Sequence, residues 1–259
     1  MFQSWLRRLL KRRNRKVSEP VAFKAGVLII GSLLWDKGRQ AWRDARLDMS
    51  QSELVSAPIR YGRRSGERRG HTYTMVFSRG AQAGHARVVL CSRAISSAED
   101  LIVESLKLWE AEALSSDSGR IASSWGRVAL LCNPNRKSPV DLLNAWAERV
   151  GREKNYRSIS QATDEGALVS KDGILQIDWP RRVEGEAAID LDLLLVTAND
   201  PTLTGTPPVY PSVETIVGAW NGADEEHAEY FWKNTDYGIR TFQDDKIRVG
   251  LRPRRQERV

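Results

Sequence analysis

A short apolar run that ends in a glycine-serine turn constrains this chain more than any other feature. Val27-Leu28-Ile29-Ile30 has the apolar, β-branched character of a buried strand, and Gly31-Ser32-Leu33-Leu34-Trp35 follows at once. Glycine and serine let the backbone turn sharply, which leaves its N–H groups free to face a ligand. The pattern predicts a buried strand followed by a turn that can hold an anionic group.

A predicted helix further along the chain carries the carboxylate Glu112 on a mostly apolar face. The helix opens with the capping-box pattern Ser96-Ser97-Ala98-Glu99 and runs to about Leu114. At about 100° per residue, Glu112 lies within about 20° of Leu101 and about 40° of Leu108. A carboxylate that faces inward is suited to general acid/base catalysis. The structural alternative is a position at the rim of the core, paired with an arginine.

The charge of the chain is concentrated at its N-terminus. The 259 residues are 41% hydrophobic and 28% charged, values typical of a soluble globular protein, and the formal net charge is +7. Residues 1–16 hold seven Lys and Arg and no acid; taking these from the 40 Lys and Arg leaves 33, equal to the 33 Asp and Glu. This distribution argues against nucleic-acid binding by the rest of the chain.

Cysteine and histidine are too few and too scattered to predict a metal site. The chain has two cysteines and three histidines, without a close Cys/His pair. Cys91 and Cys132 lie in apolar, strand-like runs, which predicts reduced core thiols in a cytoplasmic protein.

Residues 1–23 are interpreted as a basic N-terminal tail and linker. One helical stripe of this segment is apolar and faces Lys and Arg on the opposite side: Phe2, Trp5, Leu6, Leu9 and Leu10. The pattern fits a short helix that docks through residues 1–16 on an anionic membrane surface or an acidic partner, and equally a solvated tail. No apolar run reaches the eighteen or so residues of a membrane span.

The remaining chain is interpreted as one α+β domain over residues 24–250, followed by a basic C-terminal tail over 251–259. Strands are predicted at residues 26–30, 53–60, 71–78, 85–92, 128–132, 166–178 and 187–197. Helices are predicted at residues 96–114, 139–150 and 212–233. The early strands follow one another at hairpin-length gaps, which favours a mostly antiparallel or mixed sheet.

A loop flanked by Gly62 and Gly70 carries four arginines: Arg63, Arg64, Arg68 and Arg69. Guanidinium groups bind carboxylates, phosphates and nucleic-acid backbones. Because this loop joins two hairpin-like strands, a solvated turn is the preferred interpretation. The loop also lacks the Lys-Ser/Thr pair of a phosphate-binding loop.

Several segments resemble the gamma-glutamylcyclotransferase-like superfamily, especially its glutathione-degrading branch. Ile30-Gly31-Ser32-Leu33-Leu34-Trp35 resembles the Tyr-Gly-Ser-Leu-(Ile/Met)-Trp segment of that superfamily. The similarity continues, in order, through Pro58-Ile59-Arg60-Tyr61, Gly84-His85-Ala86-Arg87-Val88-Val89, Leu108-Trp109-Glu110-Ala111-Glu112 and, weakly, Glu229-Tyr230-Phe231. Apart from this weak last segment, the resemblance covers residues 26–131. Two departures are Ile30 in place of the aromatic residue and Trp109 in place of the Asp of the glutamate motif.

The resemblance implies a single domain with a mixed, β-barrel-like sheet, flanking helices and neither cofactor nor metal. It implies cyclisation of a γ-glutamyl group to 5-oxoproline, with release of an amine or amino acid. Glu112 would be the general acid/base, and the substrate-binding residues would be Gly31, Ser32, Leu33, Leu34 and Trp35. The alternative is a non-catalytic small-molecule-binding or interaction module of the same fold. Its basic N-terminal helix would dock on a membrane surface or an acidic partner.

Overall fold

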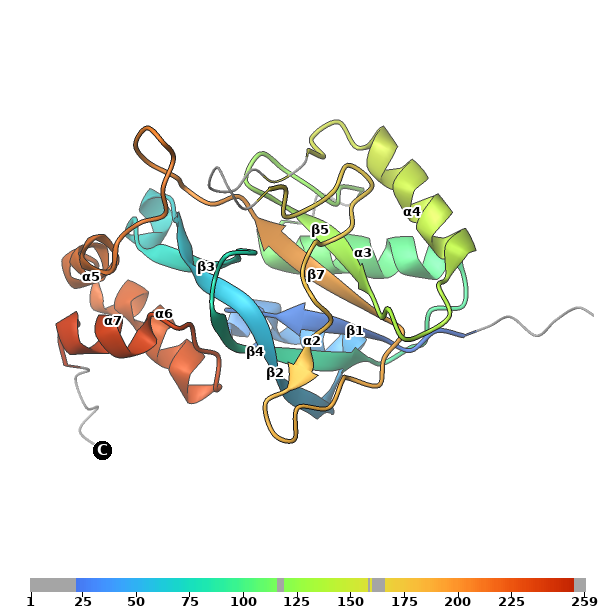
Figure 1. Ribbon diagram of the computed structural model, residues 1–259, viewed down its shortest axis with the longest axis horizontal. Helices are drawn as coiled ribbons and strands as arrows, with labels where there is room; N and C mark the ends of the chain where they lie inside the picture. Colours follow the sequence, from blue (N-terminus) through green and yellow to red (C-terminus); the bar gives the residue numbers. More distant parts are fainter. Residues whose placement is uncertain (1–21, 116–118, 158, 160–165, 254–259) are drawn as a thin grey trace, which may run out of the picture.

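The computed structural model describes residues 22–115, 119–157, 159 and 166–253 (Figure 1). The predicted basic segment at residues 1–16 and most of the C-terminal tail lie outside these ranges. The strands of the described residues are β1 (Ala25–Ile29), β2 (Leu47–Arg64), β3 (Tyr73–Phe77), β4 (Ala83–Cys91), β5 (Gly126–Cys132), β6 (Arg181–Arg182) and β7 (Leu193–Asn199). The α-helices are α2 (Gln40–Arg46), α3 (Ala98–Ala113), α4 (Val140–Arg152), α5 (Val213–Gly222), α6 (Glu225–Asp236) and α7 (Asp244–Gly250).

The strands form one mixed sheet in the order β3-β2-β4-β1-β7-β5, and β6 pairs with β2. β1 and β7 are parallel neighbours, whereas the other pairs are antiparallel. Every residue of β1 and β7 is buried, because these two strands have partners on both edges and packing on both faces. The predicted α+β class and mixed sheet are therefore confirmed.

The sheet is open in its hydrogen-bonded order, and the long strand β2 bends it. The pairing of β2 shifts register between Asp48 and Ser52 and again between Tyr61 and Arg63. Such irregularities bend a strand and increase its twist. The bend brings β3 into contact with β7, although the two strands do not pair.

Helices cover the sheet at two places (Figure 1). α3 packs against β5, β7 and α4, and its N-terminus is capped by the Ser97 side chain, which accepts a hydrogen bond from Asp100 N at 3.1 Å. The capping box predicted from the sequence places this cap one residue earlier, at Ser96 with Glu99, whereas the structure caps the helix at Ser97. The helices α5, α6 and α7, drawn in orange to red, gather at the other end, where α5 contacts β3.

Four predicted elements differ from the structure. The strand predicted at 187–197 is β7, which begins only at Leu193 and ends at Asn199. The strand predicted at 53–60 begins earlier, at Leu47, and extends to Arg64, because the first arginines of the presumed loop pair with β3. The segment 166–178 is not a strand; Gly166 and Gly173 have φ of +71° and +78°, a left-handed conformation that turns the chain. The helical region 212–233 divides into α5 and α6, because Ala223 adopts an extended conformation between them.

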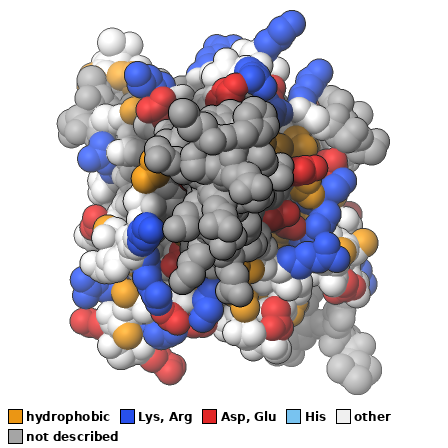
Figure 2. Space-filling model, turned by 90° about the vertical axis from the view of Figure 1, so that its right-hand side faces the viewer, with side chains coloured by type: hydrophobic (Ala, Val, Ile, Leu, Met, Phe, Trp, Pro, Cys, Tyr) orange, Lys and Arg blue, Asp and Glu red, His pale blue; other side chains and the backbone are white. Residues whose placement is uncertain are grey.

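The surface of one side of the molecule is charged with both signs. In Figure 2, described Lys and Arg side chains are interspersed with Asp and Glu instead of gathering in a patch of one sign. Among the helices that the structure describes, none combines the length and the apolar character needed to cross a membrane.

We expect Gly84→Ala to lower the free energy of unfolding by about 1 to 3 kcal/mol. A Cβ at this position of β4 would overlap the carbonyl oxygen of Arg240, whose backbone exchanges two hydrogen bonds with His85. This contact holds the connection between α6 and α7 on the sheet. Urea unfolding measures the change.

The matched control is Gly218→Ala in α5, where an added Cβ meets nothing within 4 Å. Because alanine is favoured over glycine inside a helix, this variant should gain about 0.5 to 1 kcal/mol. Equal effects of the two substitutions would contradict the close approach at Gly84.

Candidate functional site

The turn after β1 leaves two N–H groups outside its own hydrogen bonds. Leu34 N donates to the Gly31 carbonyl at 3.1 Å, and Asp36 N donates to the Ser32 carbonyl at 2.9 Å. Among the hydrogen bonds of the described residues, the N–H groups of Ser32 and Leu33 take no part in closing the turn. Backbone N–H groups of this kind can bind an anion.

Two buried arginines hold this turn in place. Arg43 Nη1 donates to the carbonyls of Leu33 and Asp36, each at 2.9 Å. Arg39, which is 1% exposed, pairs with the Asp36 carboxylate and donates through Nη2 to the Glu112 carbonyl at 3.4 Å. Arg39 therefore connects the turn to the end of the helix that carries Glu112. No local sequence pattern marks either arginine as part of a site.

Glu112 lies in the last turn of α3 and faces β7. Its Oε2 accepts a hydrogen bond from Thr197 Oγ1 at 3.3 Å, and the residue is half-buried. The ion pairs among the described residues do not include Glu112. The side chain therefore has the inward orientation predicted by helical periodicity, with a hydroxyl rather than an arginine as its bonded partner.

Two adjoining cavities meet at Glu112. The inner cavity, of about 30 Å³, is lined by the turn, β3, β7 and α6, including Gly31, Ser32, Leu33, Met75, Thr197, Asn199 and Tyr230. The outer cavity, of about 210 Å³, is lined by Ser65, Gly66, Ala113 and Trp125. Arg63, Arg69 and Glu112 line both. The inner cavity has room for about one water molecule or one carboxylate, and the outer one has room for more of a ligand.

Only part of the predicted binding segment, residues 31–35, lines the inner cavity. Gly31, Ser32 and Leu33 line the inner cavity, whereas Leu34 and Trp35 do not. Leu34 is 4% exposed and belongs to the core. Trp35 donates through Nε1 to Asn234 Oδ1 at 2.8 Å, which ties the turn to α6. Both side chains support the turn, and neither lines the inner or the outer cavity.

Arg63 is a half-buried cation next to Glu112. Burial lowers the pKa of its guanidinium, and the Glu112 carboxylate raises it. Arginine still carries its charge at neutral pH. Arg63 Cζ lies 4.5 Å from the centroid of the Trp125 ring. The interpretation of residues 62–70 as a solvated turn is therefore wrong for Arg63 and Arg69, whereas the Arg64 side chain is exposed.

Tyr230 of α6 closes the inner cavity above the turn. Its ring lies 5.7 Å, centroid to centroid, from both Trp35 and Trp220. An added Cβ on Gly31 would lie 2.5 Å from its hydroxyl oxygen. Burial raises the pKa of Tyr230, which keeps the phenol protonated as a hydrogen-bond donor. The requirement for glycine at position 31 comes from this contact.

Two polar residues of β7 that line the inner cavity could have been found from the sequence. Thr197 and Asn199 are the polar positions in β7, whose other residues are apolar or small, and they alternate. Alternate residues of a strand share one face, so two polar groups on a fully buried strand indicate a site.

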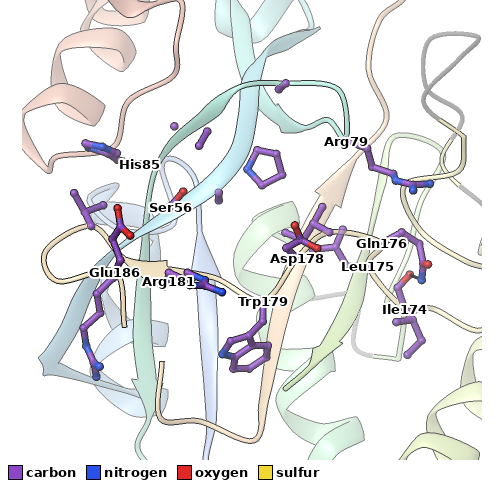
Figure 3. Close-up of a pocket in the computed structure, with 18 residues that line it drawn as sticks. Ser56, Arg79, His85, Ile174, Leu175, Gln176, Asp178, Trp179, Arg181 and Glu186 are labelled. Atoms are coloured by element: carbon purple, nitrogen blue, oxygen red, sulfur yellow. Dashed lines mark hydrogen bonds between the residues drawn. The ribbon is translucent and has the colours of Figure 1, made fainter. Parts of the chain in front are cut away.

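A larger hollow lies elsewhere, between the β2–β4 pair and residues 174–186 (Figure 3). Its volume is about 1040 Å³, and none of the predicted site residues lines it. Figure 3 shows cations and anions side by side along its wall: Arg79 and Arg181, with Asp178 and Glu186. We place the candidate site at Glu112 instead, because the glycine-serine turn and the inward carboxylate line the same cavity there.

The described residues hold no group of three His, Cys, Asp or Glu side chains arranged to bind a metal ion. Comparison of the chain with family models, with curated proteins and with solved structures gave no match in any of the three.

We expect Gly31→Ala to destabilise the protein by about 1 to 3 kcal/mol, because the new methyl group overlaps the Tyr230 hydroxyl. The ring is packed between Trp35 and Trp220 and has little room to move. In a Tyr230→Phe background the overlapping oxygen is gone, so the same substitution should cost at least about 1 kcal/mol less.

A double-mutant cycle by chemical denaturation measures this coupling. Tyr230→Phe alone supplies the reference, with an expected loss of about 0.5 to 1.5 kcal/mol for the hydrogen bonds of its hydroxyl with the Asn234 side chain and the Met75 backbone. Additive effects of the two substitutions would show that Tyr230 does not lie against the turn.

Proposed function

We propose that this chain is a gamma-glutamylcyclotransferase-like enzyme that converts a γ-glutamyl group to 5-oxoproline and releases an amine or amino acid. One observation carries the proposal. Glu112 and the unused N–H groups of the Gly31-Ser32-Leu33 turn, which are far apart in the sequence, line the same small cavity. An acid/base group beside an anion-binding turn is the minimum that this reaction needs.

The inner cavity suits the α-carboxylate of the γ-glutamyl group. Its volume of about 30 Å³ matches a small polar group rather than a whole substrate. In this arrangement the N–H groups of Ser32 and Leu33 and the protonated Tyr230 phenol donate hydrogen bonds to the carboxylate. The rest of the γ-glutamyl chain then extends past Glu112 into the outer cavity.

Glu112 would move the proton that the ring closure requires. The α-ammonium of the substrate loses a proton to the Glu112 carboxylate, and the resulting amine attacks its own γ-carbonyl carbon, which forms the new C–N bond of the lactam. The amide C–N bond to the leaving group breaks as the leaving nitrogen receives this proton from Glu112. The attacking nitrogen loses its second proton through the same carboxylate, and the released amine takes up that proton and leaves as an ammonium. The Thr197 hydroxyl, bonded to Oε2, fixes the orientation of the carboxylate.

The rate would come largely from holding the substrate in a folded conformation, because the reaction is intramolecular. Every protein group in this mechanism is a side chain or a backbone N–H of this chain.

We further propose that the bent mixed sheet corresponds to the small β-barrel of this superfamily. Its support is the contact of β3 with β7 across the bend of β2. We propose a cytoplasmic location as well, where thiols such as the buried Cys91 stay reduced.

The test is 5-oxoproline release from a panel of γ-glutamyl-amino acids, γ-glutamyl peptides and γ-glutamylamines. Wild-type protein should release 5-oxoproline from at least one of them, and Glu112→Gln should lower kcat by about 10²- to 10⁴-fold. The matched control is Glu110→Gln on the same helix, whose carboxylate is paired with Lys107 at 2.7 Å and does not line the site.

Circular dichroism and the unfolding midpoint establish that both variants are folded. Release that Glu112→Gln leaves unchanged would remove Glu112 from the mechanism. Folded wild-type protein that releases no 5-oxoproline from any compound of the panel would overturn the proposal.

A further inference from the structure

We propose that Arg63, stacked on Trp125, binds a carboxylate on the leaving group, so that the preferred substrate is a γ-glutamyl-amino acid or γ-glutamyl peptide rather than a γ-glutamylamine. The inference rests on the proposed function, because it assigns the outer cavity to the leaving group.

The charges that line the two cavities do not balance. The charged lining residues are two arginines, Arg63 and Arg69, and one carboxylate, Glu112. Neither arginine forms an ion pair with a carboxylate among the described residues. The nearby Asp200 is already bound by Arg127 at 2.6 Å. The site therefore carries one uncompensated positive charge, in surroundings dry enough to lower the pKa of Arg63.

A γ-glutamyl head cannot supply the missing negative charge. Its α-ammonium and α-carboxylate groups cancel, so a γ-glutamylamine with an alkyl leaving group enters the site as a neutral zwitterion. A γ-glutamyl-amino acid carries one further carboxylate, on the leaving group. This is the charge that complements the site, and electrostatic complementarity gives specificity in such sites.

The position of Arg63 places this carboxylate in the outer cavity. Arg63 lies near the end of β2, where it pairs with Thr74 of β3, so its backbone is held by the sheet. Trp125 lines the outer cavity but not the inner one, and it covers the guanidinium at 4.5 Å. Stacking occupies the face of a guanidinium and leaves its N–H groups free in the plane.

Trp125 itself is fixed by a second ring. Its centroid lies 5.0 Å from that of Trp109, which is 4% exposed on α3. The arginine is thus oriented before a ligand arrives, which reduces the entropy lost on binding. The outer cavity, of about 210 Å³, accommodates a small amino acid.

The experiment compares γ-glutamylalanine with γ-glutamylethylamine, which differ by one carboxylate. Wild-type protein should have a kcat/KM about 10- to 100-fold higher for γ-glutamylalanine, the range expected for a charge-assisted hydrogen bond. Arg63→Gln should bring the ratio close to one, mainly through KM for γ-glutamylalanine. Arg64→Gln, at the exposed neighbouring position, is the control and should keep the wild-type ratio.

Titration calorimetry with the Glu112→Gln variant tests the same preference without turnover. It should bind γ-glutamylalanine more tightly than γ-glutamylethylamine, and adding Arg63→Gln should remove the difference. Turnover of both compounds at equal kcat/KM, or an equal loss for both in Arg63→Gln, would overturn this inference and leave the proposed function standing. Absence of both turnover and binding would overturn the two together.

Discussion

The candidate site depends on one buried cation, Arg39. Its guanidinium reaches the Asp36 carboxylate at the end of the turn and the Glu112 carbonyl at the end of α3. A buried charge that loses one of its partners is strongly destabilising, so the two segments are held together by the cost of separating them. The chain thereby fixes a loop and a helix end that would otherwise be the most mobile parts of the site.

The sheet supplies the other walls. Because β1 and β7 are parallel neighbours, the end of β7 lies beside the turn that follows β1, and Thr197 reaches Glu112. The bend in β2, which lies on the other side of β4 from β1, then carries Arg63 to the same place. The residues of the candidate site thus come from the turn, β2, α3, Trp125, β7 and α6, and they meet at one end of the central strands.

The sequence predicts the parts of this site that depend on local rules and misses those that depend on long-range contacts. The turn at Gly31 and the inward orientation of Glu112 follow from glycine chemistry and helical periodicity, which involve only near neighbours. Arg63 looks solvated because its partners, Trp125 and Glu112, are brought to it by the bend in β2. The same limit explains the segment 166–178, where apolar residues indicate a strand but left-handed glycines turn the chain.

The wall formed by Tyr230 has a consequence for how the protein is made. This side chain lies near the end of a chain of 259 residues, whereas the turn that it covers follows the first strand. During synthesis the turn leaves the ribosome long before α6 exists to cover it. A chain terminated early therefore carries the glycine-serine turn and Glu112 but lacks the side chain that closes the inner cavity.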